Sequence, residues 1–279
     1  MNLLNFIVWN VDPDIFSIGP LTVRWYGLFW ALSFFLGYEI LGRIYKHEGI
    51  PQPKLDKLLV YIAIGSVVGA RLGHCFFYDW DYYSQNPWEI IKIWRGGLAS
   101  HGGAFGIILA MILYQRKETT QSFFWTVDRM LIVVALAALF IRMGNLMNHE
   151  IYGHITDKPW GFKFIDNIAA WQTGKDPVYT DPRHPTAIYE GIGYLFIFLS
   201  MLWMYIKKAP KLYEGFLSGY FLITLFVWRF LVEYVKEVQS PFEENMIINM
   251  GQILSIPMVL LGVGIMIYAF KAKKPAIKK

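Results

Sequence analysis

Long apolar stretches alternate with short polar connections along the 279 residues of this chain. A helix needs about 20 apolar residues to cross the hydrocarbon core of a bilayer. We predict seven membrane-spanning helices, over residues 22–43, 57–78, 98–115, 123–146, 186–206, 215–235 and 247–270. The pattern therefore indicates an all-α, polytopic membrane helix bundle, with residues 1–279 forming a single integral membrane domain.

The longest connection, about residues 147–185, is rich in Gly, Pro, Asp and aromatic residues. Connections of this length are usually functional or contain structure of their own. We expect it to form a small ordered cap at the membrane surface.

Composition and charge support a membrane protein and set its orientation. The chain is 55% hydrophobic and 17% charged, with a mean hydropathy of +0.36 and a pI of about 9.1. The Lys and Arg residues could suggest nucleic acid, but they gather in connections 44–56, 116–122 and 207–214 and in the tail. Basic residues in such positions orient helices toward the cytoplasm. We therefore exclude nucleic acid as a partner and predict an outside N-terminus, a cytoplasmic C-terminus and an extracytoplasmic 147–185 loop.

This topology brings polar side chains from six predicted helices to the outer level of the membrane. Ionisable residues inside a membrane are functional candidates by default, because burying a charge in lipid is costly. Only Glu39, Asp128 and Arg129 fall at the inner level, which favours a binding site over a conduction path. The outer level holds Arg24, Tyr26, Arg71, His74, His101, Arg142, Asn145, Tyr189, Glu190, Arg229 and Glu233.

The stretch that ends with Gly153 follows the fourth predicted helix and is unusually polar. A lone Arg142 at a helix end could simply extend to the lipid headgroups. Here Asn145, Asn148 and Glu150 supply the acceptors that a guanidinium needs, and Gly153 lets backbone approach a partner closely. We interpret this stretch as an anion-binding corner.

Arg229 and Glu233 are four residues apart on the sixth predicted helix, so their side chains share one face. The spacing predicts an ion pair. The pair is either purely structural or orients Arg229 as an electrostatic clamp on a phosphate, and both roles are compatible.

Residues 95–103 place His101 between two glycine pairs at the start of a predicted helix. Gly97 and Gly102 are candidate substrate-binding positions, because backbone N–H groups without bulky side chains favour an approaching anion. Glycine pairs in membrane helices also allow close helix packing, which is the alternative explanation. His101 is suited to proton transfer near neutral pH.

The sequence lacks the motifs of metal-dependent or covalent catalysis. It contains neither His-Glu-x-x-His nor Gly-x-Ser-x-Gly. The single cysteine, Cys75, lies in an apolar helix and is interpreted as a packing residue. We expect no metal and no cofactor, so the acceptor in any transfer reaction would bring its own nucleophile.

Six stretches, in order over most of the chain, carry a resemblance to one family. They are Arg24-Trp-Tyr-Gly27, Gly69-Ala-Arg-Leu-Gly73, Gly96-Gly-Leu-Ala-Ser-His-Gly-Gly103, Arg142-Met-Gly-Asn-Leu-Met-Asn-His-Glu-Ile-Tyr-Gly153, His184-Pro-Thr-Ala-Ile-Tyr-Glu190 and Arg229-Phe-Leu-Val-Glu233. The chain resembles prolipoprotein diacylglyceryl transferases. It departs from their pattern at Ile141, where Gly is usual, at Ala187, where Gln is usual, and from Lys236 onward, where Arg-x-Pro-Asp is usual.

The resemblance implies transfer of the diacylglyceryl group from phosphatidylglycerol to the lipobox cysteine thiol of a prolipoprotein signal peptide, forming a thioether and releasing glycerol phosphate. It also implies a multi-pass protein of the bacterial inner membrane. The competing interpretation is an outward-facing binder or transporter of anionic lipids or solutes.

The resemblance further assigns roles by position. Arg142 and Asn145 would hold the lipid headgroup, and Arg229 would stabilise the departing phosphate. His101 would assist thiol deprotonation. The remaining implied contacts are Tyr26 near the headgroup, Glu150 and Gly153 shaping the corner, and Glu233 orienting Arg229.

Overall fold

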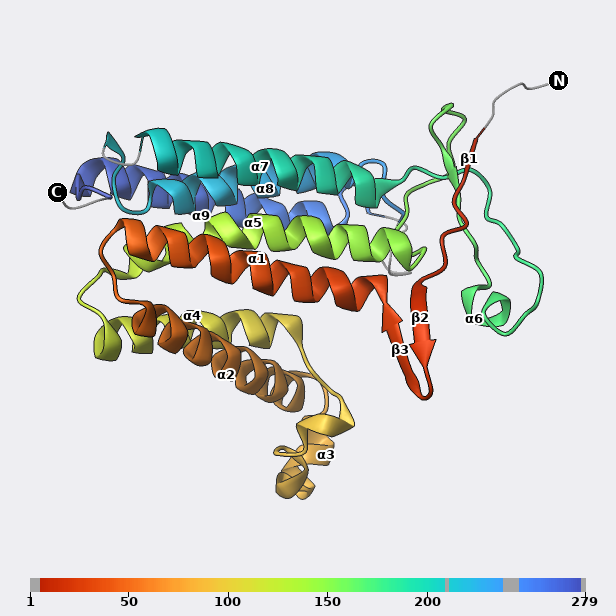
Figure 1. Cartoon of the computed structure of the whole chain (residues 1–279), viewed down its shortest axis with the longest axis horizontal. Helices are drawn as coiled ribbons and strands as arrows, with labels where there is room; N and C mark the ends of the chain where they lie inside the picture. The colour runs from red at the N-terminus through yellow and green to blue at the C-terminus, as the bar shows by residue number, and fades with distance from the viewer. Residues whose placement is uncertain (1–5, 209–210, 238–245, 277–279) are drawn as a thin grey trace. The chain divides into compact units, whose positions relative to one another are not determined.

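The computed structural model describes residues 6–208, 211–237 and 246–276, which are mostly helical (Figure 1). Contacts group the chain into two compact units, residues 1–40 with 128–279 and residues 41–127. The single integral membrane domain stays a prediction. The elements are β1 (Ile7–Val8), β2 (Asp14–Ile18), β3 (Leu21–Arg24), α1 (Trp25–His47), α2 (Gln52–Phe77), α3 (Trp80–Gln85), η1 (Pro87–Glu89), η2 (Ile93–Arg95), α4 (Ser100–Glu118), α5 (Phe123–Met147), β4 (Phe162–Lys163), α6 (Ile168–Trp171), α7 (Thr186–Lys208), α8 (Phe216–Val232) and α9 (Met250–Ala272).

Each of the seven predicted spans overlaps one long helix, so the prediction of a helical, polytopic membrane bundle is confirmed. Within the described ranges, α1, α2, α5, α7 and α9 are long and apolar enough to cross a membrane. The helices of the other two predicted spans, α4 and α8, do not meet this requirement of length and apolar composition. α8 has 17 residues, and α4 is polar at both ends, from Ser100-His to Arg-Lys-Glu118.

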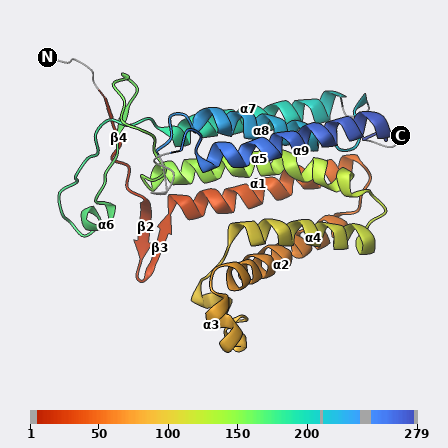
Figure 2. The same ribbon diagram turned by 180° about the vertical axis from the view of Figure 1, so that it is seen from behind.

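In the first unit, α5, α7, α8, α9 and most of α1 lie side by side (Figures 1 and 2). Asp128 of α5 fixes the start of α8, because its carboxylate accepts hydrogen bonds of 2.8 Å from the N–H groups of Gly215 and Ser218. These N–H groups belong to the first turn, where no helical carbonyl is available to them. The capped helix carries Arg229 near its other end.

Residues 147–185 form an ordered structure, as the sequence predicts. β4 pairs in parallel with β1, in the register Ile7 with Phe162. Trp9 then packs against the core formed by Leu146, Phe162, Phe164 and Ala187. Its indole N–H donates to the Leu146 carbonyl at 3.0 Å, which attaches the N-terminal segment to the end of α5.

In the second unit, α2 and α4 pack backbone against backbone through glycines. A Cβ added at Gly73 would come within 2.7 Å of the Gly102 Cα, and one added at Gly69 would meet the Gly106 Cα at the same distance. Small residues at such contacts let membrane helices approach closely. The segment between these helices, residues 79–97, contains α3, η1 and η2.

Candidate functional site

Arg142 lies in the last turns of α5, where its guanidinium contacts Glu190, Asn145 and the Tyr194 hydroxyl. Its Nε is 2.7 Å from Oε2 of Glu190 at the start of α7, whose side chain is fully buried. Its Nη1 donates to Oδ1 of Asn145 at 3.1 Å. A guanidinium carries five N–H donors in a fixed fork. These contacts orient Arg142 without using all of its donors.

Asn145 connects Arg142 to the chain that follows the helix. Its Nδ2 donates to Oε1 of Glu150 at 2.8 Å, and Nδ2 of Asn148 donates to the same oxygen at 3.2 Å. The carboxylate therefore fixes the amide with its oxygen toward Arg142. The structure brings these four side chains together, as the anion-binding interpretation of this stretch expects.

Tyr26 of α1 packs against the same end of α5. Its ring packs over Gly144, where an added Cβ would lie 2.5 Å from the Tyr26 Cδ2. Gly144, two residues after Arg142, therefore leaves the space that the aromatic ring occupies. Contact of the Tyr26 phenol with a lipid headgroup stays a prediction.

Arg229 and Glu233 form the predicted ion pair, with 3.6 Å between Nη2 and Oε1. The Arg229 side chain is 34% exposed and the Glu233 side chain 8%, so the guanidinium faces the open side. Oε2 of Glu233 accepts a hydrogen bond of 3.1 Å from Nδ2 of Asn249, next to α9. The pairing is confirmed, and the clamp on a phosphate stays a prediction.

The structure adds two functional candidates, Glu190 and Lys236, to those predicted from the sequence. The sequence places Glu190 among the polar residues of the outer level, and it marks Lys236 as a departure from the family pattern. In the structure the Lys236 Nζ lies 3.8 Å from Glu190 and 3.4 Å from Glu233. The spacing of three residues between Glu233 and Lys236 is the sequence signal that points to this contact.

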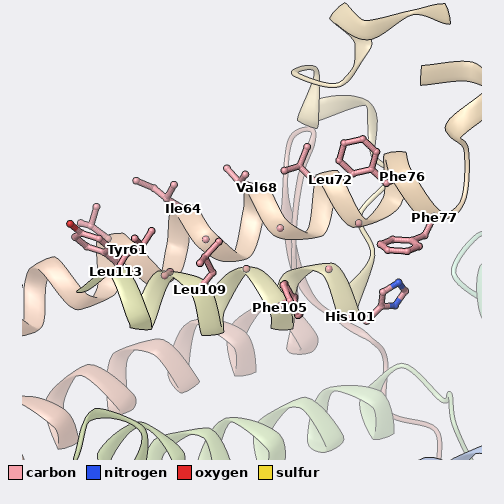
Figure 3. A pocket seen from close by; sticks show the side chains of 17 residues that line it. Tyr61, Ile64, Val68, Leu72, Phe76, Phe77, His101, Phe105, Leu109 and Leu113 are labelled. Carbon is pink, nitrogen blue, oxygen red and sulfur yellow. The ribbon is translucent and has the colours of Figure 1, made fainter. Parts of the chain in front are cut away.

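In the second unit, His101 lies at one end of an apolar groove between α2 and α4 (Figure 3). The groove has a volume of about 790 Å³ and is lined almost entirely by aliphatic and aromatic side chains. Tyr61 and Leu113 lie at the opposite end. The His101 ring approaches Tyr78, with 5.5 Å between ring centroids. An imidazole at the end of an apolar groove suits a ligand with an apolar tail and a polar end.

Arg71 of α2 holds the segment that leads to His101. The side chain is buried, and its donors reach backbone carbonyls: Nε to Ile90 at 2.8 Å, Nη2 to Glu89 at 2.6 Å and Nη1 to Gly96. The guanidinium also lies 5.0 Å from the centroid of the Tyr83 ring. One side chain therefore fixes the fold of residues 79–97.

The two glycines singled out near His101 have different roles in the structure. Gly97 has a φ of +74°, and a Cβ there would come within 2.6 Å of the His74 ring and 2.9 Å of the Arg71 Nη1. Conformation and space both require glycine at that position. Gly102 faces the backbone of α2, so the helix-packing explanation applies to it. Contact of either glycine with substrate stays a prediction.

The structure therefore joins Tyr26, Arg142, Asn145, Glu150, Glu233 and Arg229 within the first unit, while His101, Gly97 and Gly102 belong to the second. Cooperation of His101 with the arginines stays a prediction. Within the described ranges, no three His, Cys, Asp or Glu side chains are placed to hold a metal ion together.

Comparison with known proteins identifies the chain's relatives. The profile described as prolipoprotein diacylglyceryl transferase matches residues 13–268. A phosphatidylglycerol–prolipoprotein diacylglyceryl transferase of Tolumonas auensis is 44% identical, over 96% of this chain and 99% of its own length. Proteins of the same name from Chloroherpeton thalassium and Porphyromonas gingivalis are each 43% identical, over 94% and 97% of this chain and the same shares of their own lengths. With matches that extend over nearly its whole length, the chain belongs to the prolipoprotein diacylglyceryl transferase family.

Proposed function

We propose that this chain transfers the diacylglyceryl group of phosphatidylglycerol to the cysteine thiol of a prolipoprotein. The observation that carries the proposal is the near full-length identity to relatives that are named for this reaction. Arginines held by buried carboxylates in the first unit support it, because the donor lipid is an anion. A binder or transporter of anionic lipids is not favoured, since the relatives' names describe a transferase.

The reaction is a substitution at the carbon of the diacylglyceryl group that is bonded to the phosphate oxygen. The cysteine sulfur forms a bond to this carbon, the bond from carbon to phosphate oxygen breaks, and its electron pair leaves with glycerol phosphate. The thiol proton passes to a base. The phosphate changes from one negative charge to two as it departs, so fixed cations stabilise the transition state more than the bound lipid.

Each proposed residue acts on one part of this substitution. Arg142, oriented by Glu190 and Asn145, binds the phosphate, and Arg229 stabilises the charge that develops on it. Such a donor contributes about 3 to 4 kcal/mol in a site that excludes water. His101 accepts the thiol proton. The remaining proposed substrate contacts are Tyr26, Glu150, Gly153, Gly97, Gly102 and Glu233.

The proposed placement is the bacterial inner membrane, with the N-terminus outside, the C-terminus cytoplasmic and residues 147–185 on the outer side. The one-sided distribution of Lys and Arg supports this orientation. A reporter fused after Lys279 should be cytoplasmic, and one inserted near Lys175 should be extracytoplasmic. The reverse result would refute the shared outer level of the candidate residues.

A direct assay tests the reaction. Purified protein is placed in vesicles of phosphatidylglycerol that is labelled in its diacylglyceryl group. One sample receives a lipobox peptide, and a second receives a matched peptide whose cysteine is replaced by serine. Label should pass to the cysteine peptide only, with release of glycerol phosphate. Binding of lipid without transfer to either peptide would instead support the binder.

A further inference from the structure

Lys236 follows α8 and is buried between two carboxylates. Its side chain is 5% exposed, and its Nζ lies 3.4 Å from Oε1 of Glu233 and 3.8 Å from Oε1 of Glu190. A buried ammonium is costly unless it is paired. The two carboxylates supply that pairing from different helices, α7 and the end of α8.

Each of these carboxylates also holds one arginine of the proposed phosphate site. Oε2 of Glu190 lies 2.7 Å from Nε of Arg142, and Oε1 of Glu233 lies 3.6 Å from Nη2 of Arg229. The side chains therefore alternate in charge. Lys236 is the central cation of a series that begins at Arg142 and ends at Arg229.

The anion-binding corner itself fixes the backbone of Lys236. Gly153 forms an antiparallel bridge with Lys236, and the His154 N–H donates to the Val235 carbonyl at 3.0 Å. A Cβ at Gly153 would collide with that carbonyl oxygen. Glycine at position 153 is therefore what allows the chain carrying Lys236 to lie against the corner.

Charge balance separates the role of Lys236 from that of the arginines. Among the described side chains of this series, three cations face two carboxylates. The third carboxylate of the corner, Glu150, is linked to Arg142 through the Asn145 amide. The Lys236 ammonium faces the carboxylates, whereas Arg229 is partly exposed. The arginines are thus the groups available to a phosphate, and Lys236 acts on their partners.

We propose that Lys236 is a positioning residue that couples Arg142 to Arg229 by holding Glu190 and Glu233 between them. The inference rests on the proposed phosphate site. Without the ammonium, each buried carboxylate has only its arginine as a cationic partner in this series and draws it inward. The two guanidiniums then no longer face one phosphate together.

Charge removal at Lys236 tests the inference first. Lys236→Met keeps the apolar stem and removes the charge, Lys236→Arg keeps the charge, and Lys175→Met is a matched change at an exposed lysine. We expect Lys236→Met to lower kcat about 10- to 100-fold, the range of couplings between contacting residues. KM should change less, because the acyl chains supply most ground-state binding. Lys236→Arg should recover most of kcat, and Lys175→Met should match the unchanged protein.

A double-mutant cycle then tests the coupling. Arg142→Lys and Arg229→Lys are measured singly and together, first with Lys236 present and then combined with Lys236→Met. We expect the two arginine substitutions to be non-additive when Lys236 is present and additive when it is replaced. Thermal denaturation in detergent is recorded for every variant. A purely structural Lys236 would lower stability and the amount of active protein but leave the coupling unchanged.

The outcomes separate this inference from the proposed site. If both arginine variants lose activity while Lys236→Met keeps the kcat of the unchanged protein, the coupling role of Lys236 is refuted and the phosphate site stands. The same holds if the arginines remain coupled in Lys236→Met. If the single arginine variants keep full activity, the proposed phosphate site fails and this inference fails with it.

Discussion

Arg142 in the first unit and Arg71 in the second are both shielded from solvent, but different kinds of group satisfy them. Arg142 contacts side chains, the carboxylate of Glu190 and the amide of Asn145. Arg71 is 3% exposed and donates to backbone carbonyls of residues 89, 90, 96 and 97. One guanidinium is held by groups that carry charge, and the other by the chain itself.

These different hydrogen-bond partners indicate different roles for the two guanidinium groups. Carbonyl oxygens accept four hydrogen bonds from Arg71, so that residue holds the shape of the 79–97 segment. The carboxylate of Glu89 is bound by Lys92 and Arg95 instead. The hydrogen bond from Lys92 and the charge of Arg95 hold the pKa of Glu89 below its ordinary value. Arg142 has N–H donors that its side-chain contacts do not use, and under the proposed function these donors bind the phosphate. The first arrangement builds structure, and the second prepares a site.

The largest effect should come from Arg142→Lys. The substitution keeps a positive charge but loses the planar fork that grips two phosphate oxygens. We expect kcat to fall about 1,000-fold, as for removal of one strong donor to a transition state. Label transfer to the lipobox peptide measures it, with Arg116→Lys at an exposed position as the matched control. Near-normal turnover would remove the distinction between the two arginines.

His101→Ala tests whether a residue of the second unit takes part in proton transfer. Loss of a general base should lower kcat about 100-fold at neutral pH. The unperturbed thiol pKa is about 8.5, so raising the pH above that value should partly rescue His101→Ala and leave Arg142→Lys impaired. His154→Ala, at an exposed histidine, is the control. Equal pH profiles in the two impaired variants would reduce His101 to a positioning role.

Arg71→Met should act on stability rather than directly on the reaction. Several partly buried carbonyl oxygens lose their donors, and we expect the free energy of unfolding to fall by about 2 kcal/mol. Arg71→Lys should recover little, because one ammonium cannot reach carbonyls served by three guanidinium nitrogens. Thermal denaturation and limited proteolysis within residues 79–97 measure the change. The control is Arg95→Met, an arginine of the same segment whose side chain is 59% exposed. A stable but inactive Arg71→Met would place Arg71 with Arg142 instead.

The smallest effect concerns His149, which is held neutral in the first unit. Its Nδ1 accepts from the Ile165 N–H at 3.0 Å and its Nε2 donates to the Val11 carbonyl at 2.8 Å. Burial lowers its pKa from the ordinary value of 6.5. The stability from the neutral ring is therefore complete above pH 6.5 and is lost as pH falls through the folded pKa. The melting temperature should fall between pH 7 and pH 5, about the window of histidine titration, and the fall should be smaller in His149→Gln. An equal fall in His149→Gln would refute the role of the neutral His149 ring.

Local patterns in the sequence predict the helices and the short-range contacts. Arg229 meets Glu233 because the helix repeat places residues four apart on one face. Arg142, Asn145 and Glu150 meet because they flank one helix end. Each of these contacts depends on only one turn of chain, so spacing is sufficient to predict it.

Contacts between distant segments have no such signal. Glu190 meets Arg142 only because α5 and α7 pack together, and Lys236 reaches Glu190 only because Gly153 admits its backbone. The carbonyl partners of Arg71 are invisible in a sequence, because every residue carries the same carbonyl group. The partners that orient a site are therefore harder to predict than the residues that form it.

Two strand-like pairings also constrain how often the chain crosses the bilayer. β1 pairs with β4, so the ends of the intervening chain lie on the same side of the membrane and the number of crossings between them is even. α1, α2 and α5 are each long and apolar enough to cross. If all three cross, an even number is reached only when α4 crosses as well. The bridge between Gly153 and Lys236 applies the same rule to α7 and the 17-residue α8. With α1, α2, α5 and α7 all crossing the bilayer, an α4 or α8 lying on the membrane surface would be incompatible with these pairings.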